Sequence, residues 1–256
     1  MRALPVALAA LLLVLFAGVQ ASHAAFTVLN INTTVTLNQN TSATVTDIIK
    51  LSVNGTSVQE YSTDRVALNL SLSQWQNIIG PSLIEHIVNP KGAIYNFNFL
   101  PGPLVNESGN KIAYLTLAYS VENVTTVNQT GPRSFVYQFN DNVFNFQHAE
   151  SGAILGTNTT LTIILPSGSQ INEVRPLPDL PALGYEQSYK NATKLVWDSD
   201  EPLSQFQLTY TVQQSLQSEV TSFFSQLYSK LGAFSYVIII VAIVLFVVYT
   251  YLKIAK

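Results

Sequence analysis

The sequence predicts a mainly β protein: an extracellular β-sandwich, one or two in number, with a small helical insert, a juxtamembrane amphipathic helix and one C-terminal transmembrane helix. Short runs that alternate apolar with polar residues recur between residues 25 and 214, and most end at Gly, Pro or Asn, as in a sandwich. Residues 233–252 contain no charge, proline or glycine. A helix of that length crosses the roughly 30 Å hydrocarbon core of a bilayer.

Residues 1–24 have the features of a secretory signal peptide. The chain begins with an arginine at its second position, residues 3–19 are apolar, and small residues stand at the −3 and −1 positions before Ala25. An uncleaved first transmembrane helix is the alternative, although residues 3–19 are barely long enough to span a membrane. We expect a mature chain that starts near Ala25.

Strand signals dominate the exported region. A first hairpin is predicted where Asn54-Gly55, a residue pair typical of type I′ turns, joins Thr44–Val53 to Thr56–Tyr61. Further strands are predicted at Phe26–Leu37, Ile94–Phe99, Ile112–Val121, Ser134–Phe139, Thr159–Leu165, Leu195–Trp197 and Gln205–Val212.

One short helix is predicted between the first strands and the third. Ser71 or Ser73 can cap its first turn, and Gly80-Pro81 ends it. Its apolar face is formed by Leu72, Trp75, Ile78 and Ile79.

Proline-rich loops suggest the domain organisation. Pro101-Gly102-Pro103 opens a loop that runs to Asn110, and the prolines from 166 to 181 predict a long extended connection before Tyr185. We place a boundary at Pro101, with a first β region and short helix at 25–101 and a second β region at 102–214. The two regions can equally be two sheets of one core, so the number of sandwiches stays open.

The last forty residues predict attachment to a membrane. Residues 215–232 place apolar side chains at helical spacing, which indicates a juxtamembrane amphipathic helix that packs on the sandwich, lies in the headgroup layer or pairs with a partner. The transmembrane helix follows at 233–252, and residues 253–256 form a short tail. Because Lys253 and Lys256 favour the cytoplasmic side, we expect a type I single-pass protein of the cell membrane, with its ectodomain outside.

The ectodomain carries many acceptor sites for N-glycosylation. Random placement of 20 asparagines and 45 serines and threonines would give about 3.5 such sites, and a threonine-rich strand composition is the alternative cause of the excess. Nine N-x-[ST] sites occur, at Asn32, Asn40, Asn54, Asn69, Asn106, Asn123, Asn128, Asn158 and Asn191.

Composition limits how this ectodomain is stabilised. The chain has no cysteine, so disulfides are excluded and a hydrophobic core must supply the stability. Between residues 25 and 232 there are 9 basic and 15 acidic residues, about 12% of the segment against the usual quarter. Neutral polar groups must therefore form the surface, and the few scattered basic residues argue against nucleic acid as a partner.

No motif predicts catalysis, a cofactor or a metal site. Glu85-His86 and His148-Ala149-Glu150 lack the two-histidine spacing of a helical zinc site, and the chain contains no G-x-S-x-G or phosphate-binding loop. An enzyme is therefore not indicated.

One anionic segment is a calcium candidate. Asp198, Asp200 and Glu201 could supply oxygen ligands in an extracellular loop. The plainer interpretation is a solvated acidic turn before Pro202, because the glycine and distal glutamate of an EF-hand loop are missing.

Part of the chain resembles a known group of proteins. The segments Leu161–Ile171 and Val174–Pro178, followed by Leu195-Val196-Trp197 and Leu208-Thr209-Tyr210, resemble a pattern in archaeal exported β-sandwich proteins that end in a single anchor. The match covers about a fifth of the chain and consists of a strand that closes on Leu-Pro-x-Gly and a late tryptophan strand. The resemblance implies an archaeal surface protein and no particular activity.

Together these features favour a glycosylated cell-envelope protein. We expect its ectodomain to bind other surface proteins or glycans, or to have a structural role in the envelope. An accessory subunit of a membrane complex, such as a transporter or respiratory assembly, is the second hypothesis. A hydrolase of envelope polymers is the third, and it requires a deep pocket around His86 or His148 with converging carboxylates.

Overall fold

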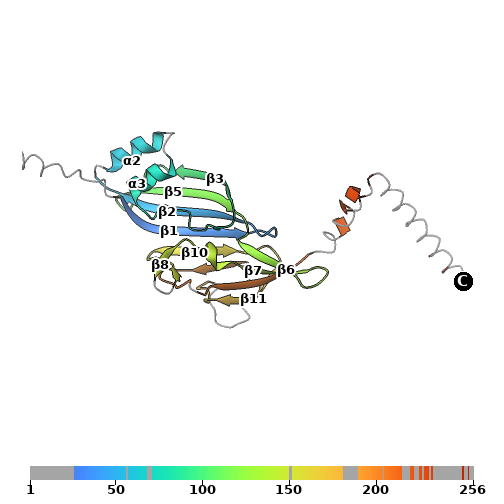
Figure 1. Ribbon diagram of the computed structural model, residues 1–256. Coiled ribbons are helices and arrows are strands. Elements are labelled where there is room, and N and C mark those ends of the chain that lie inside the picture. The colour runs from blue at the N-terminus through green and yellow to red at the C-terminus, as the bar shows by residue number, and fades with distance from the viewer. Residues whose placement is uncertain are drawn as a thin grey trace, which may run out of the picture.

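Two β-sheets and two short helices make up most of the part of the chain that the computed structural model describes (Figure 1). That part comprises residues 26–55, 57–67, 71–149, 152–180, 190–203, 205–214, 220–221, 225–226, 228–230, 232, 250 and 253. The strands are β1 Phe26–Leu37, β2 Ala43–Val53, β3 Ile94–Pro101, β4 Val105–Glu107, β5 Asn110–Val121, β6 Thr125–Gln129, β7 Ser134–Phe139, β8 Gln147–Ala149, β9 Gly152–Ile154, β10 Thr159–Ile164, β11 Ser169–Arg175, β12 Lys194–Trp197 and β13 Gln207–Gln213. The helices are α2 Ser57–Val66 and α3 Leu72–Ile79, with a 3-10 turn, η1, at Asp141–Val143.

The larger sheet has seven strands. Its order is β12-β10-β1-β2-β5-β3, and β4 pairs with the start of β5. All its pairs are antiparallel except β1 with β10, where Ile31 lies opposite Thr159 and Thr36 opposite Ile164. The first and tenth strands are therefore central neighbours although more than a hundred residues separate them in sequence.

Alternation of side chains gives this sheet one buried face. On β2, Val45, Asp47, Ile49 and Leu51 are buried, whereas the residues between them are exposed or half-buried. The same period of two runs along β1, β5 and β10. The apolar face of a sheet with this pattern must be shielded from water, and the second sheet and the helices shield it.

The smaller sheet has the order β11-β13-β7-β6, and all its pairs are antiparallel. Its inward residues, including Tyr137, Phe139 and Leu208, join the inward residues of the larger sheet in one hydrophobic cluster. Trp197 on β12 meets Phe206, just before β13, with ring centroids 5.2 Å apart. The two sheets therefore share a core. A separate two-stranded sheet, β8-β9, lies beside them.

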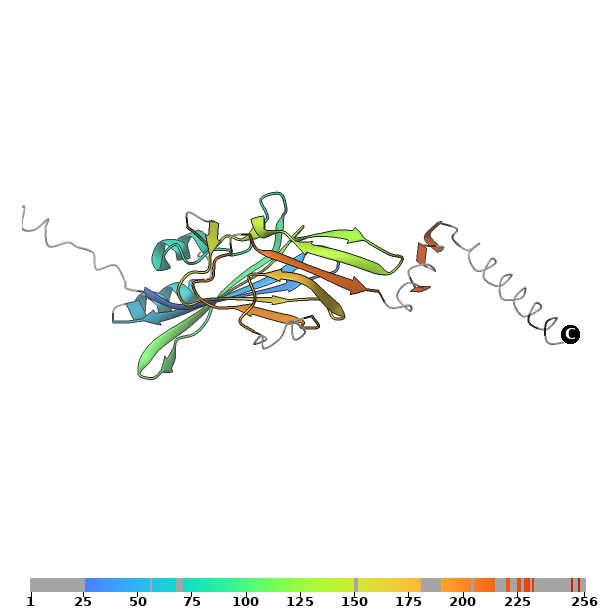
Figure 2. The same cartoon turned by 90° about the horizontal axis from the view of Figure 1, so that it is seen from below.

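The helices cover one end of the same buried face. Figures 1 and 2 both place α2 and α3 at the end of the larger sheet that is remote from β6. Tyr61 of α2 contacts the rings of Phe26 and Trp75, and Trp75 of α3 contacts Phe99 on β3. Tyr61 and Trp75 are buried in the same hydrophobic cluster as the inward residues of the two sheets.

The predicted helix is confirmed at α3. Ser71 is its N-cap, and a capping box joins the Ser71 side chain and backbone to Gln74. The helix ends at Gly80, whose φ of +112° suits a residue without a β-carbon. The buried face consists of Trp75 and Ile79.

The hairpin predicted at Asn54-Gly55 is wrong. Gly55 has the expected positive φ, but residues 57–66 form helix α2 instead of a strand. Strand β2 already pairs with β1 on one side and β5 on the other, so no edge is free for another strand at this turn. The first hairpin instead joins β1 to β2 around Asn38–Ser42, where Asn40 Oδ1 accepts hydrogen bonds from the amide and hydroxyl of Ser42.

The long connection predicted from Pro166 to Tyr185 is wrong in its first half, because it contains strand β11. The prediction also omitted the short strands β4, β6, β8 and β9.

Strand β3 ends at Pro101 and pairs with β5 beyond it, so residues on both sides of Pro101 belong to one sheet. Mainly β structure, with two sheets and small helices, is confirmed.

Several predicted segments lie outside the described residues. These are the signal peptide at 1–24, nearly all of the transmembrane helix at 233–252, and parts of 215–232. Within 215–232, the described residues Val220, Thr221, 225–226 and 228–230 are helical. No helix within the described residues combines the length and the apolarity that a membrane span requires.

Candidate functional site

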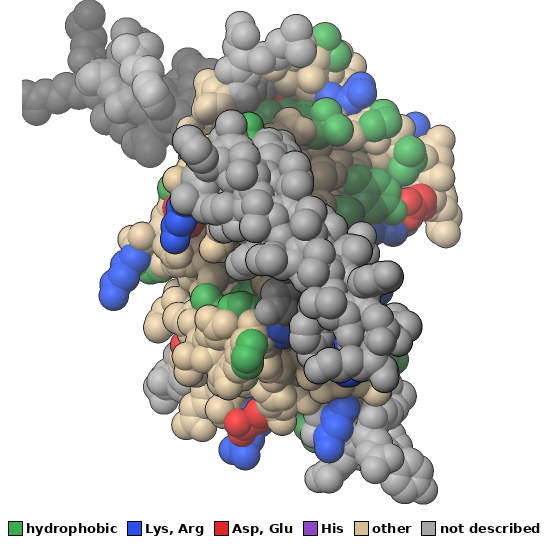
Figure 3. Space-filling model, turned by 90° about the vertical axis from the view of Figure 1, so that its right-hand side faces the viewer, with side chains coloured by type: hydrophobic (Ala, Val, Ile, Leu, Met, Phe, Trp, Pro, Cys, Tyr) green, Lys and Arg blue, Asp and Glu red, His purple; other side chains and the backbone are tan. Residues whose placement is uncertain are grey.

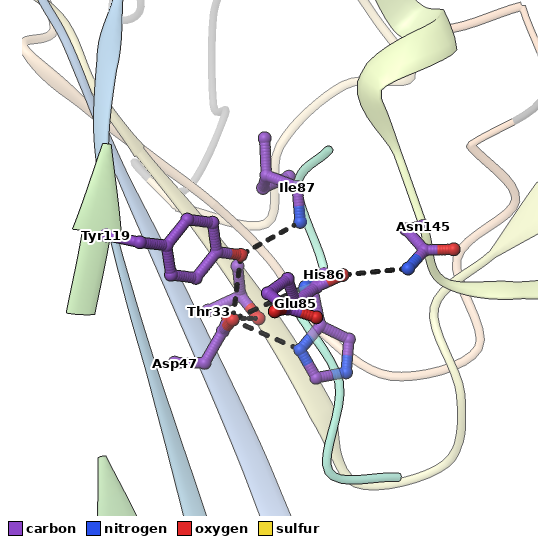
Figure 4. A network of polar contacts seen from close by, with 7 residues as sticks. All are labelled: Thr33, Asp47, Glu85, His86, Ile87, Tyr119 and Asn145. Carbon is purple, nitrogen blue, oxygen red and sulfur yellow. Dashed lines mark hydrogen bonds and ion pairs between the residues drawn. The ribbon is translucent and has the colours of Figure 1, made fainter. Parts of the chain in front are cut away.

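A carboxylate is buried at the centre of the larger sheet. Asp47 on β2 has no exposed surface, and its Oδ1 accepts a 2.6 Å hydrogen bond from the hydroxyl of Thr33 on β1. Its Oδ2 accepts one from the hydroxyl of Tyr119 on β5 at 3.0 Å and a longer one, 3.4 Å, from the backbone N–H of His86. Three adjacent strands and one loop thus meet at a single side chain (Figure 4).

His86 completes this network from the loop that follows α3. Its Nδ1 lies 3.3 Å from Asp47 Oδ1, which is within ion-pair distance for a protonated imidazole, although the direction does not complete a hydrogen bond. The imidazole stacks on Phe146 with ring centroids 5.2 Å apart. Asn145 holds the loop through two hydrogen bonds. Its backbone N–H donates to the carbonyl of His86, and its side-chain amide donates to the carbonyl of Glu85. The ring is therefore fixed on two sides.

Tyr119 links the carboxylate to the same loop. Its hydroxyl donates to Asp47 and accepts from the backbone N–H of Ile87 at 3.1 Å. Burial, and after it the negative charge of Asp47, raises the pKa of Tyr119 above its usual value. The phenol therefore stays protonated and keeps donating at neutral pH.

A small cavity of about 160 Å³ lies against His86. Ser82, Asn145, Gln147 and Thr159 contribute polar side chains to its lining. Figure 4 shows that the second ring nitrogen of His86, Nε2, is directed away from Asp47. The arrangement has a buried acid behind an imidazole and a polar cavity in front of it, which makes it the candidate functional site.

His86 was a candidate from the sequence, but Asp47 was not recognised. The signal was present, because Asp47 occupies an inward position in an alternating strand where an apolar residue is expected. A charge at such a position requires hydrogen-bond partners. The identity of those partners depends on strand register and on a loop 39 residues away, and neither is visible in the sequence.

The other candidate residues lie elsewhere. His148 is on β8, but its side chain and Glu150 are not among the parts described. Across the described residues, no group of three or more His, Cys, Asp or Glu side chains is close enough to hold a metal ion.

The acidic segment at 198–201 forms a turn after β12. Asp198 and Asp200 each accept a 3.1 Å hydrogen bond from a threonine hydroxyl, of Thr160 and Thr157 respectively. Backbone hydrogen bonds join Asp200 and Glu201 to Leu155. The two aspartates therefore fasten the turn to the sheet, and calcium binding here stays a prediction.

The glycosylation acceptors share one property. All eight described acceptor asparagines are exposed, and Asn69 lies outside the described residues. Five other described asparagines are buried or half-buried, at 30, 38, 89, 140 and 145, and none belongs to an acceptor site. No buried or half-buried asparagine among the described residues thus belongs to an acceptor site, although the exposed acceptor Asn40 also accepts the hydrogen bonds of Ser42 in the first hairpin.

Charged side chains are sparse on the described surface that Figure 3 shows. Figure 3 shows a face with isolated basic and acidic side chains and one gathering of hydrophobic side chains in its upper part. Exposed apolar residues include Val66 on α2 and Phe97 and Leu100 on β3. Lys50 and Glu107 form an ion pair at 2.6 Å, and the Lys50 hydrogen bond lowers the pKa of Glu107.

Comparisons with known proteins give no family. No family model matches the chain, and no curated protein matches it. It resembles the NMR structure of the folded domain of LppM from Mycobacterium tuberculosis, with a TM-score of 0.30 and 8% identity over 79% of this chain and 99% of that domain. At this TM-score the resemblance assigns neither family nor function.

Proposed function

We propose that this chain is a membrane-anchored, N-glycosylated protein of the cell surface whose β-sandwich ectodomain binds other envelope components. In this proposal residues 1–24 direct export, residues 215–232 form the amphipathic helix beside the membrane, residues 233–252 span the membrane, and residues 253–256 face the cytoplasm. Its placement among archaeal exported surface proteins belongs to the same proposal.

The separation of asparagines supports it most directly. Every described N-x-[ST] asparagine is exposed, whereas the asparagines that the fold uses internally lack the acceptor pattern. For example, Asn89, which is buried, and Asn145, which is half-buried, donate to backbone carbonyls. A glycosylated ectodomain requires this separation, because a glycan is bulky and must remain in solvent.

The first test is the intact mass of the full-length protein purified from its native host. We expect a mass above that of the processed chain, and a return to the bare mass after deglycosylation. Asn158→Gln should remove one glycan. Asn172→Gln is the matched control, because Asn172 is exposed but lies outside any N-x-[ST] site, and it should leave the mass of the attached glycans unchanged.

The second test addresses binding. The native protein, solubilised in mild detergent, is captured and its partners are identified. Envelope proteins or glycans recovered with it agree with the proposal. A stoichiometric multispan partner would instead favour an accessory subunit of a membrane complex.

The hydrolase alternative finds one supporting observation. Ser82 lines the same cavity as His86, and Asp47 lies behind the imidazole. However, no hydrogen bond joins Ser82 to His86 in the described part of the chain, so the acid and the imidazole have no aligned nucleophile there. Binding therefore remains the leading proposal.

A further inference from the structure

The cavity beside His86 is lined in part by polar side chains that have no hydrogen-bond partner in the described part of the chain. Within the described residues, the side chains of Ser82, Gln147 and Thr159 make no hydrogen bond, yet all three line the same cavity. Thr159 is buried, with 4% of its surface exposed, whereas Ser82 is half-buried and Gln147 is exposed. Their polar groups line an open cavity and are therefore available to hydrogen-bond a molecule that enters it.

The chemistry of the lining selects a neutral ligand. No Lys, Arg, Asp or Glu lines the cavity in the described structure, and its polar groups are hydroxyls, amides and one imidazole. Hydroxyls and amides both donate and accept, as alcohol groups do. A fully charged ligand would lose its hydration without an opposite charge to replace it.

The apolar lining and the volume of the cavity restrict the class of ligand further. Ile31, Ile84 and Phe146 present apolar surface between the polar groups, which suits the C–H faces of a small ring or carbon chain. The volume of about 160 Å³ corresponds to roughly five water molecules in the liquid. The cavity therefore accepts one small polyol or the edge of one sugar ring.

The imidazole of His86 is preorganised in the absence of a ligand. Oδ1 of Asp47 lies 3.3 Å from Nδ1 of the imidazole without completing a hydrogen bond, Phe146 stacks on one face, and the ring itself lines the cavity. Nε2 is turned away from the carboxylate (Figure 4). A ring fixed in this way loses little freedom when it accepts or donates one more hydrogen bond.

We propose that this cavity binds the vicinal hydroxyl groups of a neutral polyol, with His86, Thr159 and Gln147 as hydrogen-bonding partners. The source is either the terminal sugar of an envelope glycan or a free polyol. This inference deepens the proposed binding function and rests on it only for the source of the ligand.

The test uses the full-length protein, produced without glycans and held in a detergent that has no sugar headgroup. Saturation-transfer NMR measures binding of three probes: methyl α-D-mannopyranoside for a glycan terminus, glycerol for a free polyol, and acetate as a charged molecule of similar size. We expect the glycoside or glycerol to bind, and acetate to show no binding.

Two variants locate the binding. Thr159→Val removes a hydroxyl without changing the shape, keeps the acceptor pattern at Asn158, and should weaken binding about tenfold. Its matched control is Thr116→Val on β5, outside the cavity, which should change affinity by less than about twofold. Should Thr159→Val fold poorly, Gly156→Ala replaces it, because the new methyl group would lie 3.1 Å from the Gln147 amide and displace it. Gly131→Ala, with its nearest contact at 3.6 Å, is the control for that change.

Each result of the binding experiment either supports or overturns the proposed polyol site. Glycoside binding that Thr159→Val weakens supports a glycan terminus, and glycerol binding alone supports a free polyol. Binding of neither probe, preference for acetate, or equal affinity in Thr159→Val and Thr116→Val would overturn the assignment. A failed pull-down with intact probe binding would reject the proposed envelope partner but leave the cavity assignment standing.

Discussion

Asp47 on β2 accepts a 2.6 Å hydrogen bond from Thr33, its direct cross-strand partner on β1. The pair lies inside the sheet, where a carboxylate is costly unless its oxygens are satisfied. Tyr119 and the backbone of His86 satisfy the second oxygen. The network therefore joins the seven-stranded sheet to the loop that forms the cavity.

Replacing Asp47 by asparagine should destabilise the fold. The change places an N–H₂ group where Thr33, or Tyr119 and the His86 amide, now donate, so one donor would face another. We expect a loss of about 1–3 kcal/mol in the free energy of unfolding, measured by urea denaturation. Asp141→Asn, at an exposed position on η1, should stay within about 0.5 kcal/mol. Equal losses in the two variants would contradict this role for Asp47.

Tyr119→Phe should have a related effect. It removes the donor to Asp47 and leaves the backbone N–H of Ile87 without its acceptor. We expect a loss of about 2 kcal/mol in the same denaturation experiment. Tyr95→Phe is the control, because Tyr95 is 36% exposed on the edge strand β3, and it should be nearly neutral. A neutral Tyr119→Phe would show that the hydroxyl does not support the loop.

Stability should fall in alkaline solution. Burial raises the pKa of Tyr61 to about 12, and its hydroxyl donates to the carbonyl of Gly102 at 2.7 Å. The unfolded tyrosine titrates near pH 10, so between pH 10 and 12 the unfolded state releases a proton that the folded state keeps. The stabilisation is complete below about pH 10 and declines by about 1.4 kcal/mol per pH unit above it.

Urea denaturation at pH 9, 10 and 11 measures this decline, and Tyr61→Phe should reduce its slope. Some slope should remain, because burial also raises the pKa values of Tyr119, Tyr137 and Tyr210. Identical slopes for the wild type and Tyr61→Phe would rule out the contribution of Tyr61.

Ser71→Ala tests the start of α3. The substitution removes one half of the capping box and leaves the backbone N–H of Gln74 without its side-chain acceptor. We expect a loss of about 1 kcal/mol, measured from the urea midpoint. Ser199→Ala, in the exposed turn after β12, serves as the control and should change stability by less than about 0.5 kcal/mol. A Ser71→Ala protein as stable as this control would mean that packing of Trp75 alone holds the helix.

Local patterns predicted the long strands and the capped helix well. The alternation of residues 26–37 matched β1 end to end, and Ser71 with Gly80 bounded α3 as predicted. The hairpin prediction at Asn54-Gly55 was wrong because a turn signal does not reveal whether the preceding strand has a free edge for pairing. The four missed strands of three to five residues are too short for periodicity to show.

The candidate site was only half visible. His86 was noticed as one of two histidines outside the signal segment, but its partner Asp47 is 39 residues earlier and reaches it through the register of three strands. The cavity gathers residues from β1, the loop after α3, the segment around β8 and the start of β10. Such a site depends on tertiary structure, and no spacing along the chain encodes it.

The parallel pairing of β1 with β10 delays completion of the centre of the larger sheet while the chain is being synthesised. Asn30 and Ile31 bind the carbonyl of Asn158, 128 and 127 residues later, so one side of β1 must wait until most of the chain has been made. Until then a threonine- and valine-rich strand edge is open to wrong partners. Closing so long a loop slows folding. A nascent chain shorter than about 165 residues therefore cannot complete its central sheet, and it depends on dilution or a chaperone to stay unaggregated.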